Sequence, residues 1–407
     1  MDLPASTSGM CVADNRAALF SRPAFLGILT AVAAPLVAGA GGLEAAGAAG
    51  SVPFPEPRGP LSRGNAAAVQ LARGSDLVAA TYARVEALAG SIADRELRAD
   101  VLDLIRGPRA LYADRHPSPA LRTAVRDALA REGFVAADAP VRGIFPQGTE
   151  PGTTTSIQPF WSAPGSGEGS HHGYPGGLAL HESFNASVAL GIAGQYDAHY
   201  FGGRPTVSRD TAIAAALYHD VIKTVVFAWN DDGTLADELA IAGTGGHHVL
   251  SGAEAIARGR DPRFVTTLLS AHAAPSLGDE AKVVAWCRAA AIVAGVDPVA
   301  FGLVKRDGSG YALAADPAPL EAFVNFLSDH DYVVSVHAMH VVSARLQQSW
   351  SRRPALTNLA PTFAWYRAMI LTRTSALALY DTLARSGADA FERSVLRVES
   401  QLAPLRV

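Results

Sequence analysis

Four short stretches of the 407-residue chain concentrate histidine beside glycine or aspartate. Imidazole nitrogens and carboxylate oxygens are the ligands that iron, manganese and zinc prefer. A lone histidine in an apolar helix is usually a packed core residue, and we expect His337 and His340 to be structural for that reason. Several clusters in order are harder to explain by packing, so the sequence predicts a metal site. The stretches and the aspartates that follow them are His171-His172 with His181, His219-Asp220, His247-His248, His272, and then Asp297, Asp329 and Asp331.

The adjacent pair His219-Asp220 is the centre of this prediction. Neighbouring residues lie about 100° apart around a helix, so each can ligate one of two nearby ions, or the carboxylate can bridge them. Lys223 lies one turn beyond His219 and shares its face. A lysine aimed into such a site attracts a phosphate or carboxylate group. We therefore predict catalytic roles for Asp220 and Lys223, and a small anionic substrate.

The order of these motifs resembles the HD-domain superfamily, whose members carry a first His, a His-Asp pair, one or two further His and a late Asp on a helical bundle. Residues 172–181 are similar to the His-x-Tyr-Pro-Gly-Gly-x-x-x-His motif of one branch. Residues 219–223 match His-Asp-x-x-Lys, with Ile222 in place of the usual glycine. His248 with Gly252 matches the third element, which favours His248 over His247. The resemblance covers roughly residues 165–350.

The last aspartate departs from the family pattern. In many members it lies in mid-helix soon after the fourth histidine, but residues 283–291 contain no acid. Asp297 precedes Pro298, which suits a capping role. His330-Asp331-Tyr332 resembles the closing motif of some members, so we predict Asp331 as the final ligand, with Asp329 and Asp297 as alternatives. The ligand set that the resemblance implies is His181, His219, Asp220, His248, His272 and Asp331.

The resemblance also implies the chemistry. Most characterised members of the superfamily hydrolyse phosphate esters or phosphodiesters with one or two divalent metal ions. A smaller group holds two irons and oxidises a small polar substrate with dioxygen, and a non-catalytic metal-binding scaffold is a third alternative. Iron, manganese and zinc all suit the ligands, and the expected fold is an all-α HD-domain bundle.

Composition agrees with a helical protein and argues against one class of partner. Hydrophobic residues make up 49% of the chain, and the net charge is −4. Because the chain has no excess of basic residues that could bind a phosphate backbone, we expect no nucleic-acid partner. The abundance of alanine favours helices. Two cysteines cannot form a disulfide framework.

The first fifty residues predict export. Arg16 and Arg22 precede an uncharged run at 24–43, and small residues follow, as in a cleavable signal peptide. Ser21-Arg22-Pro23 resembles a twin-arginine signal with proline in place of the second arginine. We expect a periplasmic protein without stable membrane insertion, and a retained anchor is the alternative.

Helices must position the clusters, and their spacing predicts where these helices lie. We expect a helical N-terminal region at 51–140, either a small domain or a packing layer. A Gly/Pro-rich loop at 141–170 follows, as a lid, a rim or a mere covering. The metal-binding domain then occupies 171–350, and C-terminal helices occupy 351–407. The individual helices are expected at 65–93, 96–106, 119–132, 178–195, 210–229 with Asp210 as N-cap, 247–258, 262–272, 279–294 and 319–350.

Overall fold

The computed structural model describes residues 52–150, 152–153, 155–276 and 278–407. The predicted export signal at 1–50 lies outside this range. Among the described residues, no helix combines the length and apolar character needed to span a bilayer.

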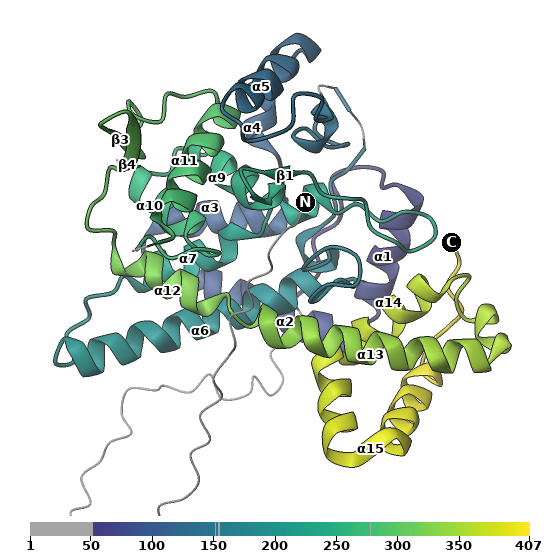
Figure 1. Ribbon diagram of the computed structural model, residues 1–407. Coiled ribbons are helices and arrows are strands. Elements are labelled where there is room, and N and C mark those ends of the chain that lie inside the picture. The colour runs from purple at the N-terminus through teal and green to yellow at the C-terminus, as the bar shows by residue number, and fades with distance from the viewer. Residues whose placement is uncertain (1–51, 151, 154, 277) are drawn as a thin grey trace, which may run out of the picture. The chain divides into compact units, whose positions relative to one another are not determined.

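Helices dominate the described chain, so the all-α class is confirmed (Figure 1). The strands described are two short antiparallel hairpins that the sequence analysis did not predict: β1 (Ala240–Ile241) with β2 (Thr244–Gly245), and β3 (Val304–Asp307) with β4 (Gly310–Leu313). The helices are α1 (Arg63–Arg73), α2 (Asp76–Gly90), α3 (Arg95–Arg106), α4 (Leu111–Asp114), α5 (Pro119–Arg131), α6 (Gly177–Tyr200), α7 (Arg209–His219), α8 (Lys223–Val226), α9 (Gly246–Ala257), α10 (Pro262–Leu269), α11 (Glu280–Ala294), α12 (Leu320–Ser328), α13 (Tyr332–Arg352), α14 (Phe363–Thr374) and α15 (Ala376–Glu399).

Side-chain caps decide where several helices begin. The helix expected at 65–93 divides because Ser75 accepts a hydrogen bond from the backbone N–H of Val78 and starts α2. The N-cap predicted for α7 was wrong. Ser208 caps that helix, and the carboxylate of Asp210 instead accepts from the backbone of Ala93 and Asp94. Asp210 therefore ties α7 to the turn before α3.

Two expected helices are interrupted beside the predicted metal ligands. The helix expected at 210–229 ends at His219, and tight i→i+3 turns lead from Asp220 into the short α8. The helix expected at 319–350 breaks between Ser328 and Tyr332, which separates α12 from α13. As a result Asp220 and Asp329 occupy the C-terminal caps of α7 and α12.

One large hydrophobic cluster runs through the described chain, from Ala67 in α1 to Val398 in α15, and a small second cluster lies around Ala189, Ala193 and Val207. Helix α2 packs against α6, and α13 packs against α15. The N-terminal helices therefore share a core with the helices of residues 171–350, and behave as a packing layer.

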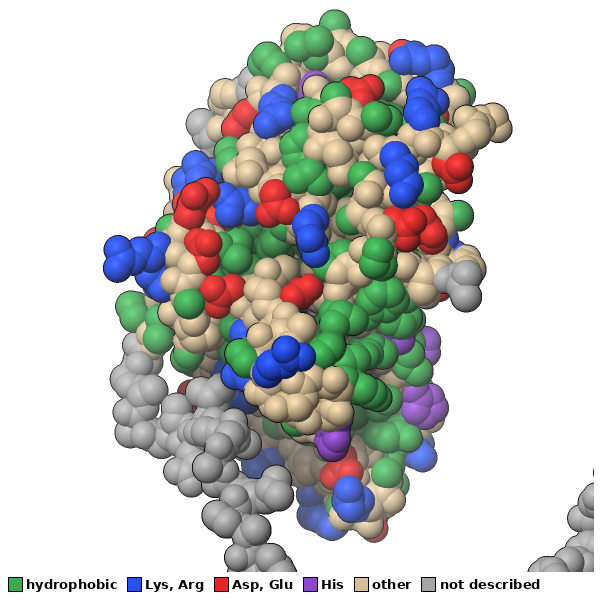
Figure 2. All heavy atoms as spheres, turned by 90° about the vertical axis from the view of Figure 1, so that its left-hand side faces the viewer, with side chains coloured by type: hydrophobic (Ala, Val, Ile, Leu, Met, Phe, Trp, Pro, Cys, Tyr) green, Lys and Arg blue, Asp and Glu red, His purple; other side chains and the backbone are tan. Residues whose placement is uncertain are grey.

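The outer sides of α6, α12 and α13 expose large hydrophobic side chains, namely Phe184, Tyr200, Leu327, Tyr332, Val333 and Val334. Figure 2 shows a face of the molecule on which hydrophobic side chains gather next to histidines. The outer side of α6 also carries a shallow hollow of about 580 Å³ between Val188 and Tyr200.

Candidate metal centre

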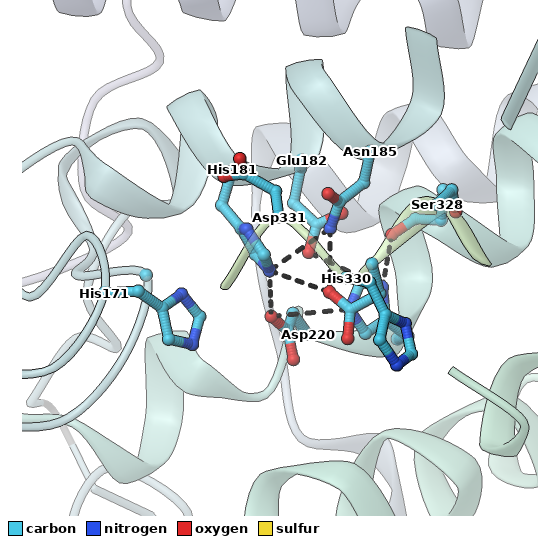
Figure 3. A network of polar contacts seen from close by, with 12 residues as sticks. His171, His181, Glu182, Asn185, Asp220, Ser328, His330 and Asp331 are labelled. Carbon is cyan, nitrogen blue, oxygen red and sulfur yellow. Dashed lines mark hydrogen bonds and ion pairs between the residues drawn. The ribbon is translucent and has the colours of Figure 1, made fainter. Parts of the chain in front are cut away.

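Six buried or half-buried side chains converge from five separate segments. His181 comes from the start of α6, His219 and Asp220 from the end of α7, His247 from the start of α9, His272 from beyond α10, and Asp329 from the α12–α13 break. Their nitrogen and oxygen atoms form overlapping groups of three or four, and within each group all atoms lie within 4.8 Å of one another. Figure 3 shows part of this network from close by.

The two oxygens of Asp220 face different histidines. Oδ2 lies 3.3 Å from His181 Nε2 and 3.5 Å from His219 Nε2. Oδ1 lies 3.2 Å from His247 Nε2. Asp220 therefore stands between two sets of donor atoms.

Asp329 divides its oxygens in the same way. Its Oδ1 lies 3.1 Å from His181 Nε2 and 3.3 Å from His219 Nε2, whereas its Oδ2 lies 3.2 Å from His272 Nε2. Each aspartate thus presents one oxygen to the pair His181/His219 and the other to the pair His247/His272.

Hydrogen bonds on the far side of two rings fix the nitrogen that faces the centre. The Nδ1–H of His219 donates to the carbonyl of Ala216 at 2.7 Å. The Nδ1–H of His247 donates to Glu238 Oε1 at 2.5 Å. A neutral imidazole has a single N–H, so both Nε2 lone pairs then point at carboxylate oxygens. Two facing acceptors need a cation between them, either a proton on the ring or a metal ion.

The buried acids and histidines of the centre shift one another's pKa values. Burial opposes a charge on His219, but the carboxylates of Asp220, Glu182 and Asp329 outweigh it and raise its pKa to about 10. Burial likewise opposes a charge on His181, and Asp220 and Asp329 raise its pKa to about 9. Burial alone would raise the pKa of Asp220, yet His219 and Lys223 hold that pKa well below its usual range. Without metal, protons on His181 and His219 neutralise the buried carboxylates beside them.

The helix ends reinforce this demand for positive charge. A helix carries a partial negative charge at its C-terminus, which disfavours a carboxylate there. Both Asp220 and Asp329 cap helix C-termini and are buried. These positions are electrostatically unfavourable for aspartate unless cations compensate them.

Lys223 lies inside the centre, with a buried ammonium group. It donates a 2.6 Å hydrogen bond to the carbonyl of Gly165 and pairs closely with Asp220. The Gly/Pro-rich loop therefore reaches the site, because Gly165 belongs to it. In this arrangement Lys223 neutralises Asp220.

The turn before α6 has little room. Gly176 has a φ of 84°, and a Cβ on Gly177 would lie 1.9 Å from the carbonyl oxygen of His172. This close approach holds His171 and His172 near His181, with ring centroids 4.9 and 5.3 Å from it.

Two of the predicted ligands lie outside these groups. The ring of His248 stacks on His272 at 4.2 Å and meets the edge of Trp286, because the start of α9 turns consecutive side chains about 100° apart. His247 takes the central position in its place. Asp331 lies 4.0 Å from His172 Nε2 and accepts from the hydroxyl of Ser335, so Asp329 is the aspartate at the centre. Asp297 caps a turn by accepting from Val299 and Ala300.

Sequence reasoning missed several residues at the centre. Glu238 lies nine residues before His247, and no sequence signal identifies it. Asn185, one turn after His181, donates to Asp329 at 3.0 Å. Glu182 is fully buried, and a charged residue within an apolar helix was a signal that could have been read.

Comparisons with protein-family models, curated proteins and solved structures found no match. The HD-domain resemblance therefore stays a prediction from the motifs.

Proposed function

We propose that this chain is a metal-dependent hydrolase of the HD type that acts on a phosphate ester or phosphodiester. The observation that carries the proposal is the division of both aspartates between two histidine pairs. This arrangement offers two neighbouring cation positions, with Asp220 and Asp329 shared by both.

The donor set fits divalent iron, manganese or zinc. His181 and His219 would hold one ion, and His247 and His272 the other, together with the shared carboxylates. Glu238 would orient His247 from behind, an arrangement common around metal-bound histidines. Divalent ions bound here would activate water and withdraw charge from phosphoryl oxygens.

The chain's own residues would orient the metal ligands and keep water out of the buried part of the site. Lys223 holds Asp220 in place and links it to the loop at Gly165. The site opens at its edge, where the side chain of His272 is 28% exposed and His171 is half-buried. Burial holds the pKa values of His171 and His172 well below the usual histidine range. Their neutral rings would offer N–H donors to an anionic substrate at this edge.

Metal analysis combined with an activity screen tests the proposal. The protein should contain about two divalent ions per chain, and should cleave a generic aryl phosphate or aryl phosphodiester when supplied with manganese, zinc or iron. His219→Ala and Asp220→Ala should each lose the metal and the activity but stay helical by circular dichroism. Retention of metal by both variants would disprove the site. Oxygen consumption by an iron-loaded protein without ester cleavage would favour the oxygenase alternative.

A further inference from the structure

Glu182 is a buried carboxylate at the metal centre for which the two proposed cation positions give no role. It is 0% exposed, and neither of its oxygens has a hydrogen-bond partner among the described residues. Its carboxylate belongs to a group with His181, His219 and Asp220 whose ligand atoms lie within 4.8 Å of one another. Figure 3 shows His181, Glu182 and Asn185 directed together from α6 toward Asp220.

The neighbouring donors are already engaged elsewhere. Glu182 Oε1 lies 3.7 Å from His219 Nδ1, but that N–H donates to the carbonyl of Ala216. The amide of Asn185 donates to Asp329 and lies 3.1 Å from His181 Nε2. A buried carboxylate without a donor is unfavourable unless it is neutralised or binds a cation.

We propose that Glu182 is a third carboxylate ligand of the centre and binds the ion held by His181, His219 and Asp220. This assignment rests on the proposed metal centre and extends it. It adds one negative charge on the His181/His219 side, where Lys223 already neutralises part of the charge of Asp220. The ion on that side would therefore have a more anionic ligand set than the ion on the side of His247 and His272.

A glutamine at this position distinguishes a ligand from a merely buried acid. A protonated glutamate and a glutamine have nearly the same shape, and both are neutral. If Glu182 stays protonated and has no metal role, Glu182→Gln keeps the metal affinity of the wild type. If Glu182 binds the ion, the variant loses an anionic oxygen and binds metal more weakly.

The experiment measures Mn²⁺ binding by calorimetry and elemental analysis on the full protein. We expect Glu182→Gln to weaken one of two binding steps by at least about 10–100-fold, since that range is known for residues that only orient a metal ligand and a direct ligand contributes no less. The melting temperature of the metal-free variant should be equal to or above that of the wild type, which shows that it folds. Binding of Mn²⁺ with unchanged affinity and stoichiometry would overturn the assignment.

Glu254 provides a matched control. It is equally buried, but it accepts from Arg258 and from the backbone of Tyr112, away from the metal centre. Glu254→Gln should lower the melting temperature and leave Mn²⁺ affinity unchanged. A similar loss of affinity in both variants would indicate a general packing defect and would contradict a ligand role for Glu182.

A Co²⁺-loaded sample gives a second readout that does not depend on affinity. Replacing a carboxylate ligand should change the visible d–d absorption of one bound Co²⁺, and an identical spectrum in Glu182→Gln would count against ligation. Failure of the wild type itself to bind either metal would instead refute the proposed centre as a whole.

Discussion

At the scale of residues, the centre is defined by which atom of each side chain faces inward. Asp220 and Asp329 each place their two oxygens against different histidines. The Nδ1–H of His219 donates to the carbonyl of Ala216, and the Nδ1–H of His247 donates to Glu238. The Nε2 lone pairs of these histidines therefore face the carboxylate oxygens, and a group of facing acceptors favours a bound cation. The histidine and aspartate motifs could be found in the sequence, because their order is unusual for packed core residues. The choices of His247 over His248 and of Asp329 over Asp331 depend on side-chain direction, which no motif encodes.

Asp329 and Asp331 make a direct comparison, because they are two residues apart with different surroundings. Asp329→Asn should weaken divalent metal binding by more than about 100-fold, since it removes an anionic oxygen from both histidine pairs. Asp331→Asn should bind metal as the wild type does, because its carboxylate contacts Ser335 at the edge of the site. Calorimetric titration with Mn²⁺ measures both. A larger loss in Asp331→Asn would restore the assignment made from the closing motif.

Lys223 gives a prediction about stability. Lys223→Met removes the partner of Asp220 and leaves the Gly165 carbonyl without its donor, so the metal-free protein should lose about 3–5 kcal/mol of unfolding free energy. A divalent ion can neutralise Asp220 instead, so the loss should be smaller in the metal-loaded protein. Denaturant unfolding with and without chelator tests this difference. Equal losses in the two states would mean that Lys223 acts independently of the metal.

The pH dependence follows from the raised histidine pKa values. In the folded, metal-free protein the neighbouring carboxylates raise the pKa of His181 to about 9 and the pKa of His219 to about 10, above the usual value of 6.5. Their stabilising contribution is therefore complete below about pH 6.5 and is lost as the pH rises toward 10. Glu182, whose pKa burial raises to about 7, destabilises the fold in the same direction as it ionises.

The melting temperature of chelator-treated protein should accordingly fall between pH 6.5 and 9.5, and metal affinity should rise over the same interval because metal displaces protons. Thermal scans across this range check the first expectation, with metal-loaded protein as the control. A metal-free protein that becomes more stable with rising pH would contradict the assigned proton sites.

At the scale of elements, helix ends and tight turns decide what enters the centre. Hydrophobic periodicity predicted most helices well, including α3, α5, α9 and α11. It could not locate the breaks at Asp220 and Asp329, because apolar residues continue on both sides of each break. Tertiary contacts stabilise those breaks, because His181 and His272, from other parts of the chain, form ion pairs with the capping aspartates. The Asp210 cap failed for a similar reason, because the turn before α3 recruits that carboxylate.

Two glycines of α6 test the role of the turn before that helix. Gly177→Ala should destabilise the protein by about 1–3 kcal/mol and reduce metal affinity, because the new methyl group would displace His172. Gly191→Ala has open space around its Cβ and should stabilise the helix by about 1 kcal/mol. Chemical denaturation with metal titration measures both variants. Equal and small effects would show that the turn tolerates a side chain.

At the scale of the whole described molecule, one large core joins the N-terminal helices to the helices that carry the candidate metal centre. The buried guanidinium of Arg258, the C-cap of α9, contacts Glu254 in α9 and Asp100 and Asp103 in α3. The sequence suggested either a small domain or a packing layer at 51–140, and amphipathic helices alone could not distinguish them. A domain and a packing layer differ in which helix faces pack against each other, and only the folded structure shows that packing.

Because Arg258 joins α3 to α9, we expect the N-terminal helices and the rest of the described chain to unfold in one cooperative transition. Arg258→Ala leaves Glu254 buried without its cation and should lower the unfolding free energy by about 3–5 kcal/mol, with a single transition at the lower temperature. Calorimetry provides the measurement, and Arg385→Ala is the control, because that exposed ion pair with Asp381 should make no measurable contribution. Two separate transitions in the Arg258 variant would indicate independent domains.

Anomalous X-ray diffraction from Mn²⁺- or Zn²⁺-loaded crystals tests the central claim most directly. Two anomalous peaks are expected, one beside His181 and His219 and one beside His247 and His272, with Asp220 and Asp329 contacting both. Metal peaks elsewhere in the chain, or none at this cluster under saturating metal, would contradict the account.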